Sequence, residues 1–177
     1  MIDISAYLSS FKETSWDPMK GESLINDDYY PVYNFDSITT AICREWRMGE
    51  NLSSCDGLIL TDKIYLVEFK NQRMMNIDKK VLHKKAFDTL YLLQRAAFEY
   101  MSLEELGKKC VLYVVHVKSE SASFDSFRAK VAGFAKENHP IDFALSKYRK
   151  LYSDVYTVGR DDFIKEHIPR IFKARPL

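Results

Sequence analysis

The segment from residue 53 to residue 70 constrains the fold more than any other part of this chain. It contains two apolar runs rich in β-branched residues, SSCDGLIL and IYLVEFK, which are separated by the turn-like Thr61-Asp62-Lys63. Two such runs joined by a short polar loop are typical of a β-hairpin. We therefore expect two adjacent antiparallel strands here.

Amphipathic helices are predicted on both sides of this hairpin. The first should begin at Asp36 or Ser37, either of which is a natural N-cap, and end near Gly49. The second is longer, with Asn76 as its cap and Gly107 near its end. It carries one apolar stripe that should pack across the hairpin's sheet, made of Leu82, Ala86, Leu90, Leu93, Ala97 and Met101.

The run CVLYVVHV at residues 110–117 is almost continuously apolar, which suits a central strand covered on both faces. Near the N-terminus we expect a short helix at residues 4–11 and an aromatic extended piece at residues 29–35. Pro31 confines that piece to an edge strand or an irregular strand. The remaining expected elements are a helix within residues 124–136, a strand at residues 154–158 and a last helix limited by Pro169.

No internal repeat, low-complexity tract or linker divides the chain. We therefore expect a single domain over residues 1–177. It comprises an N-terminal extension (1–36), a core (37–118), and a C-terminal strand with helices (119–177). The predicted fold class is α/β, with a mixed β-sheet flanked by helices.

Composition indicates the cellular setting of the protein more than it indicates any reaction that it catalyses. Lys and Arg number 26 and Asp and Glu number 25, so the net charge of +1 does not indicate a polyanion partner, and any nucleic-acid surface must be local. Cys43, Cys55 and Cys110 form no CxxC pair, which favours a reducing intracellular setting. Neither a signal peptide nor a membrane-spanning run is evident, so we expect a cytoplasmic protein without a membrane partner.

Three charged residues of the hairpin form the candidate catalytic group. Residues two apart on a strand point to the same face, so Glu68 and Lys70 project together while Phe69 faces the opposite layer. A turn at residues 61–63 places Asp56, at the start of the first strand, across from Glu68. Two acids and a lysine should therefore converge at one end of an apolar hairpin.

A divalent cation would explain why these charges lie in an apolar hairpin. Unpaired buried charges are costly, whereas Mg²⁺ prefers oxygen ligands that include one or two carboxylates. The expected ligands are Asp56, Glu68 and the backbone carbonyl of Phe69. Such an ion polarises a phosphodiester and acidifies a bound water, and Lys70 would orient that nucleophile or stabilise developing charge.

The segment resembles the PD-(D/E)XK, or restriction-endonuclease-like, superfamily. Asp56 matches the family's lone Asp, Glu68-Phe69-Lys70 matches its E-x-K, and Gln72 extends this to the E-x-K-x-Q of some members. Cys55 stands where the motif has Pro. The resemblance implies a restriction-endonuclease-like core over residues 37–118, in which both acids bind metal and the lysine assists catalysis.

Two further residues are weighed for this site. Many members of the family carry an acid on the helix before the hairpin, and Glu45 is the candidate because it follows Ile38 by about two turns on the core-facing side. A partly buried salt bridge to Arg44 or Arg47 is the alternative. Gln72 either supports catalysis or is simply a polar residue leaving a strand.

A basic segment follows the hairpin and is the best local candidate for phosphate contact, with a solvated helix face as the alternative. Its members are Arg73, Lys79, Lys80, Lys84 and Lys85. Trp16 and Trp46 are assigned to the core, and His116 is assigned no metal role because no histidine spacing indicates a metal site.

The sequence therefore predicts a Mg²⁺- or Mn²⁺-dependent endonuclease, with DNA favoured over RNA as substrate. Asp56 and Glu68 are the expected metal ligands, Lys70 is the catalytic lysine, and Gln72 and Glu45 support them. One alternative is a catalytically inactive nuclease-fold module that binds nucleic acid or a partner protein, and a homodimer is possible. Another is a small interaction protein in which the charged residues form only an ion-pair network.

Overall fold

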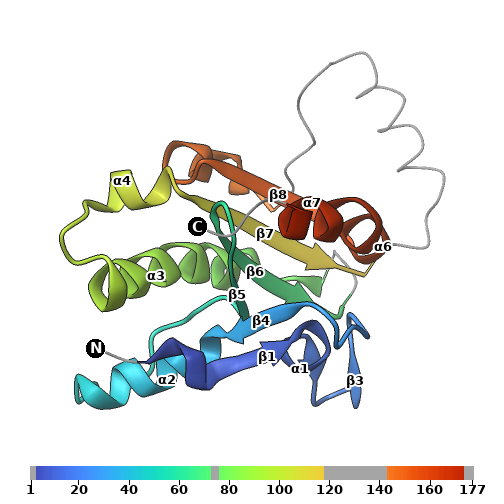
Figure 1. Cartoon of the computed structure of the whole chain (residues 1–177), viewed down its shortest axis with the longest axis horizontal. Helices are drawn as coiled ribbons and strands as arrows, with labels where there is room; N and C mark the ends of the chain where they lie inside the picture. The colour runs from blue at the N-terminus through green and yellow to red at the C-terminus, as the bar shows by residue number, and fades with distance from the viewer. Residues whose placement is uncertain (1–2, 73–75, 118–142, 174–177) are drawn as a thin grey trace.

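A six-stranded mixed β-sheet organises the computed structural model, which describes residues 3–72, 76–117 and 143–173 (Figure 1). The strand order is β1-β4-β5-β6-β7-β8, and a separate pair, β2 (Trp16–Asp17) and β3 (Glu22–Ser23), lies outside this sheet. The sheet strands are β1 (Leu8–Ser10), β4 (Pro31–Asn34), β5 (Gly57–Leu60), β6 (Ile64–Lys70), β7 (Cys110–His116) and β8 (Asp154–Gly159).

The predicted hairpin is confirmed. Strands β5 and β6 pair antiparallel with Gly57 opposite Val67 and Leu60 opposite Ile64. On its other side β6 pairs with β7 in parallel along its whole length, from Ile64 opposite Cys110 to Lys70 opposite His116. The β7 strand is central and buried at every position, as its apolar run predicts, and it pairs in parallel with β8.

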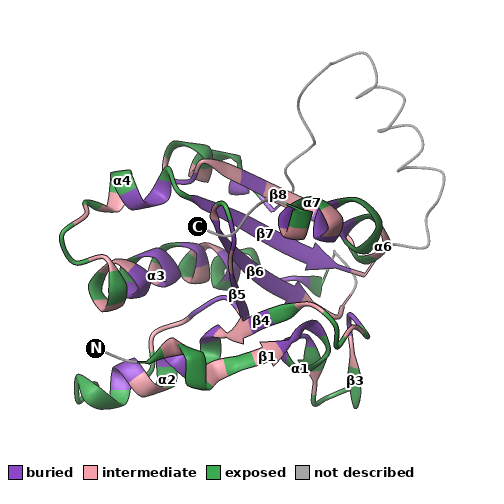
Figure 2. Cartoon of the chain, viewed as in Figure 1, coloured by how far each residue is buried: buried purple, intermediate pink, exposed green. Residues whose placement is uncertain are grey.

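Helices cover both faces of the sheet. They are α1 (Phe11–Thr14), α2 (Phe35–Glu45), α3 (Lys79–Ala97), α4 (Leu103–Gly107), α6 (Arg160–Asp162) and α7 (Ile168–Lys173), with a π-helical turn at Phe163–His167 and 3₁₀ turns at Ile4–Tyr7 and Leu145–Lys150. Figure 2 shows the buried central strands between these helices. The fold class is therefore α/β with a mixed sheet flanked by helices.

Alternation along β6 assigns its side chains to two cores. Ile64 and Leu66 pack with residues of α2 and α3, whereas Tyr65, Val67 and Phe69 pack with residues of α1 and α7. Glu68 and Lys70 continue the first set and so point to the α3 face. The predicted stripe of α3 is buried in the same core at Leu82, Ala86, Leu90 and Leu93, which confirms the layer order.

The N-terminal segment is part of the sheet rather than an appendage. Strand β4 lies between β1 and β5, so of the two predicted alternatives the edge strand is wrong, and β4 is a short strand that is only partly paired on each side. Pro31 is tolerated because it is the first residue of β4 and pairs only with Ser10 of β1, while β5 reaches only Tyr33 and Asn34. The expected helix over residues 4–11 is wrong in its middle: Ile4–Tyr7 forms a 3₁₀ turn, residues 8–10 form β1, and Phe11 begins α1.

Helix ends differ from the predicted ones where a neighbouring side chain makes the better cap. Asn34 caps α2 by accepting from the Ser37 N–H at 2.9 Å, and Asp78 rather than Asn76 caps α3. The expected long helix is interrupted after Ala97 and resumes as α4, whose capping box is formed by Ser102.

The C-terminal predictions are met in part. Strand β8 confirms the expected strand at residues 154–158, and the helix expected within residues 124–136 lies outside the described residues. Pro169 does not end the last helix, which runs on to Lys173. The π-helical turn just before Pro169 already makes the hydrogen-bond ladder irregular there, and a proline fits such a place. None of the helices in the described part of the chain has the length and apolar character that crossing a bilayer requires.

Candidate active site

The register of the hairpin brings Asp56 and Glu68 together. Gly57 pairs with Val67, so one further step along the two strands sets Asp56 opposite Glu68. Residues directly opposite in an antiparallel pair share a face and lie close together. Asp56 Oδ2 also accepts a hydrogen bond from the Phe69 N–H at 2.6 Å, which fixes the carboxylate against the end of β6.

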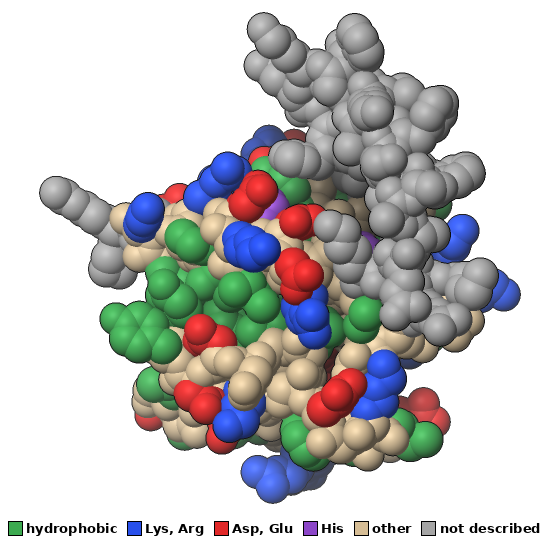
Figure 3. Space-filling view, turned by 90° about the vertical axis from the view of Figure 1, so that its right-hand side faces the viewer, with side chains coloured by type: hydrophobic (Ala, Val, Ile, Leu, Met, Phe, Trp, Pro, Cys, Tyr) green, Lys and Arg blue, Asp and Glu red, His purple; other side chains and the backbone are tan. Residues whose placement is uncertain are grey.

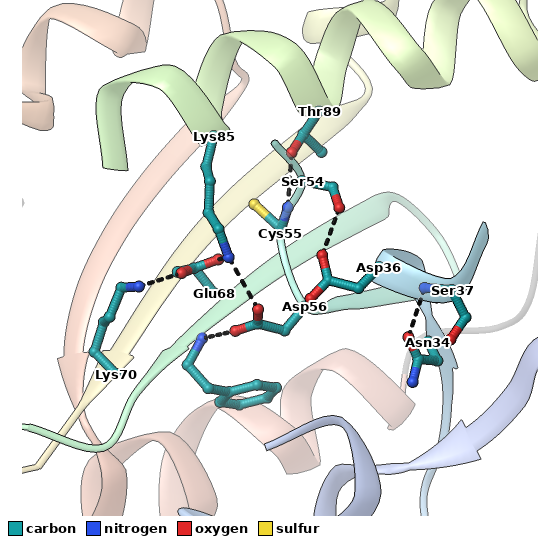
Figure 4. A network of polar contacts seen from close by, with 11 residues as sticks. Asn34, Asp36, Ser37, Ser54, Cys55, Asp56, Glu68, Lys70, Lys85 and Thr89 are labelled. Carbon is teal, nitrogen blue, oxygen red and sulfur yellow. Dashed lines mark hydrogen bonds and ion pairs between the residues drawn. The ribbon is translucent and has the colours of Figure 1, made fainter. Parts of the chain in front are cut away.

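Two lysines neutralise these acids (Figure 4). Lys85 reaches down from α3 and places Nζ 3.1 Å from Asp56 Oδ1 and 2.8 Å from Glu68 Oε2. Lys70 Nζ lies 2.6 Å from Glu68 Oε1. The Glu68 side chain is only 2% exposed, and those of the other three residues are 16–17% exposed, so the four charges form one partly buried network.

Side chains from α2 and α3 hold the loop that leads to Asp56. Both helices flank this loop, and every residue from 53 to 56 makes at least one hydrogen bond to them. The bonds are Ser53 N–H to Asp88 Oδ2, Ser54 Oγ to Asp36 Oδ1, Cys55 N–H to Thr89 Oγ1 and Phe35 N–H to the Asp56 carbonyl, at 3.2, 2.6, 2.8 and 2.9 Å. Asp56 is therefore positioned by the fold before any ligand arrives.

The electrostatics of the network are strongly perturbed. Burial and, after it, the negative charges of Glu68 and Asp36 raise the pKa of Asp56 to about 8, against the opposing effect of Lys85. Burial alone would lower the pKa of Lys85, but the carboxylates of Glu68 and Asp56 outweigh it and raise that pKa above its ordinary value. Lys85 is thus a stable cation. Burial and the neighbouring carboxylates favour the protonated form of Asp56 more than Lys85 opposes it.

Glu68 Oε1 is buried and accepts no hydrogen bond of good geometry from the described residues, although Lys70 Nζ lies at ion-pair distance. The two charges attract each other, although the contact lacks the angle that a hydrogen bond needs. A buried carboxylate oxygen without a hydrogen bond retains a lone pair that a donor or a cation can use.

The structure corrects the assignment of Glu45. This residue is the last of α2 and is exposed, because the buried part of the helix ends at Cys43, two positions earlier. The acid that α2 brings to the site is Asp36, in its first turn, which bonds to Ser54 and raises the Asp56 pKa. From the sequence alone, Asp36 is predicted only as a helix cap.

Lys85 is the functional residue whose role sequence reasoning missed, because it was grouped with the basic surface segment. A signal was present: Lys85 follows Leu82 by three residues and precedes Thr89 by four, and both of these are buried. That spacing places Lys85 on the inward face of the helix, whereas Lys80 and Lys84 are exposed.

The other predicted residues are less closely tied to the acids. Gln72 follows the end of β6 and is half-buried, and Arg73 lies outside the described residues. Lys79, Lys80 and Lys84 are exposed on the first two turns of α3, and their predicted phosphate contact stays a prediction. Among the described side chains on the face shown in Figure 3, basic and acidic groups are intermixed and form no broad patch of one sign.

A cleft of about 620 Å³ leads to Asp56. Its walls come from residues 13–18, from α2 and from the end of β6, and they include Trp16, Asp36, Arg44, Asp56 and Phe69. Trp16 is 53% exposed and Trp46 is 38% exposed, so their assignment to the core is wrong. His116 is buried beside Lys70 in the register and contacts the Val117 carbonyl, as a core histidine does.

Comparison of the chain with family models, with curated proteins and with solved structures gives no match. Within residues 3–72, 76–117 and 143–173, no three His, Cys, Asp or Glu side chains are grouped so that they could hold a metal ion. The site is therefore defined by its own geometry: an acid pair, two ammonium groups and a cleft that opens on Asp56.

Proposed function

We propose that this chain is a metal-dependent nuclease of the restriction-endonuclease-like kind that hydrolyses phosphodiester bonds of nucleic acid, with DNA favoured over RNA. The observation that carries the proposal is the convergence of the Asp56 and Glu68 carboxylates on Lys85, with Asp56 lining the cleft and Lys70 beside Glu68. The E-x-K spacing and the sheet topology of helix, hairpin, helix and parallel strand agree with it.

The residues present suit Mg²⁺ or Mn²⁺. Asp56 and Glu68 offer oxygen ligands, and the raised pKa of Asp56 reflects a site that would be stabilised by more positive charge. The Phe69 N–H points to Asp56, and the N–H and C=O of one strand residue point to the same side, so its carbonyl is directed there too. A bound ion would polarise the phosphodiester and lower the pKa of a water.

The chain's own groups would do the rest. Lys70 is adjacent to Glu68 on the same strand face and would orient the attacking water or stabilise charge on the phosphoryl oxygens. Asp56 is held by the 53–56 loop, so the ligand geometry needs little rearrangement. The exposed Trp16 ring and Arg44 line the approach and are placed to contact a base and a phosphate.

The test is cleavage of plasmid, single-stranded DNA and RNA with Mg²⁺ or Mn²⁺, each repeated with a chelator. Asp56→Asn and Glu68→Gln should abolish metal-dependent cleavage. Glu104→Gln is a matched control, because Glu104 is an exposed acid in a surface pair with Lys108. Cleavage that survives in either site variant, or that the chelator does not stop, would reject the proposal.

A second candidate is a catalytically inactive module of the same fold that binds nucleic acid or a protein partner, alone or as a homodimer. The favouring observation is that both carboxylates already have an ammonium partner, since Lys85 contacts Asp56 and Glu68 and Lys70 contacts Glu68. Binding of an oligonucleotide without cleavage, unchanged by Asp56→Asn, would identify this function.

A further inference from the structure

We propose that Lys85 is a tethered cation that occupies the metal position of the Asp56–Glu68 pair, and that a divalent ion binds by displacing it. This inference rests on the proposed metal-dependent function. It assigns to Lys85 control over how tightly the site holds metal, a role distinct from that of the neighbouring Lys70.

The geometry carries this inference. Lys85 Nζ bridges one oxygen of each acid, Asp56 Oδ1 at 3.1 Å and Glu68 Oε2 at 2.8 Å, and so places a positive charge between the two carboxylates. The second Asp56 oxygen is bonded to the Phe69 N–H, and the second Glu68 oxygen faces Lys70. Lys85 contacts both acids, so a metal ion held by both would compete with it for their negative charge.

Electrostatic repulsion should prevent Lys85 and a divalent ion from occupying the site together. A divalent ion held by Asp56 and Glu68 would lie close to the Lys85 ammonium, and two cations in a partly buried site repel strongly. Lys85 can leave, because its side chain is a flexible stem that remains 17% exposed. The displaced ammonium would then be free to meet a phosphate group of the substrate.

The test measures metal binding rather than activity. Mn²⁺ is titrated calorimetrically into the parent protein, Lys85→Met and Lys84→Met, since Lys84 is the exposed neighbour on the same helix. We expect Lys85→Met to bind Mn²⁺ at least tenfold more tightly than the parent, and Lys84→Met to match the parent. Equal or weaker binding by folded Lys85→Met overturns the inference.

A measurement on the parent protein covers the case in which Lys85→Met fails to fold. Lysine acylation, quantified by mass spectrometry, should find Lys85 protected without metal and reactive at saturating Mn²⁺, with Lys84 reactive in both states. Lys85 that stays protected at saturation overturns the inference.

The outcomes separate this inference from the proposed function. Tighter Mn²⁺ binding by Lys85→Met without cleavage by any variant supports the tethered cation and rejects the nuclease. Cleavage by the parent with no gain of Mn²⁺ affinity in Lys85→Met supports the nuclease and rejects the tethered cation. No Mn²⁺ binding by any variant rejects both.

Discussion

Glu68 and Lys70 lie two residues apart yet should have separable roles. If Glu68 is a metal ligand, Glu68→Gln should weaken Mg²⁺ binding and abolish cleavage together, because a neutral amide lacks the charge that a hard cation needs. Lys70→Met should leave metal affinity equal or slightly higher, since a nearby positive charge is removed, while the chemical step slows by about a hundredfold or more. Single-turnover cleavage and metal titration on both variants test this, and a Lys70→Met protein that cleaves at the parent rate contradicts it.

The three cysteines provide a measure of the integrity of the core. Cys43, Cys55 and Cys110 are free and buried, and burial raises the pKa of the Cys110 thiol to about 12. We expect no thiol to react with an aromatic disulfide reagent at pH 8 until the chain unfolds, after which all react. Labelling of native Cys110 at the rate of a free thiol would contradict its placement.

The same shift has a defined pH dependence. The pKa of Cys110 is higher in the folded chain than in the unfolded chain, where it is about 8.5. Below about pH 8.5 the thiol is protonated in both states, so its titration does not lower the free energy of unfolding there. The free energy of unfolding should fall as the pH rises from about 8.5 towards 12. Urea unfolding across this range measures the fall, and Cys110→Ala should reduce it.

At the scale of the element, the contact between α4 and the segment before β8 depends on a missing side chain. A Cβ at Gly107 would lie 1.8 Å from the Leu151 carbonyl oxygen, and the Gly107 carbonyl accepts from the Ser153 N–H at 2.9 Å. Gly107→Ala should therefore destabilise the fold by about 1–3 kcal/mol, which lowers the melting temperature by roughly 2–4 °C per kcal/mol.

Gly49→Ala is the matched control for this prediction. A Cβ at Gly49 meets nothing within 4 Å, and Gly49 does not have a positive φ. Its melting temperature should be equal to or slightly above that of the parent, because alanine restricts the unfolded chain. A Gly107→Ala protein as stable as Gly49→Ala would show that the two segments do not pack this closely.

Elements were predictable from the sequence where one pattern dominates. Continuous apolar runs predicted the hairpin and β7, and an apolar stripe at helical spacing predicted α3. Helix ends were less predictable, since Asn34 and Asp78 compete with nearby polar residues as caps. The prediction that Glu45 belongs to the site was wrong for a related reason. Helical periodicity gives the direction of a side chain, but it does not show whether a neighbouring layer extends far enough to cover it.

At the scale of the whole molecule, the main correction concerns the first 34 residues. Sequence spacing showed that Asp56, Glu68 and Lys70 share a face, because that depends on neighbouring strands. The insertion of β4 between β1 and β5 depends on a distant pairing that no local pattern records. Lys85 and Asp36 each reach the site from another element; helical spacing indicates that Lys85 faces inward, but it does not indicate that the Lys85 side chain meets the acids.

Removal of residues 1–34 should consequently prevent folding rather than trim an extension. The deletion removes β1 and β4, exposes the edge of β5 and takes Phe11, Leu24, Ile25 and Val32 from the core beneath the sheet. We expect the truncated chain to lack a cooperative thermal transition in circular dichroism. A sharp transition in that chain would restore the view of this segment as an appendage.

Strand β6 has partners on both sides, while the strands nearest the chain ends form the two edges of the sheet. Local opening in proteins begins at such edges and reaches the interior at a higher free energy. The amides of Leu66 to Glu68 should accordingly be among the slowest to exchange with deuterium. Fraying at either end of the chain would then leave the acid pair intact, and the site would be lost only when the whole sheet opens.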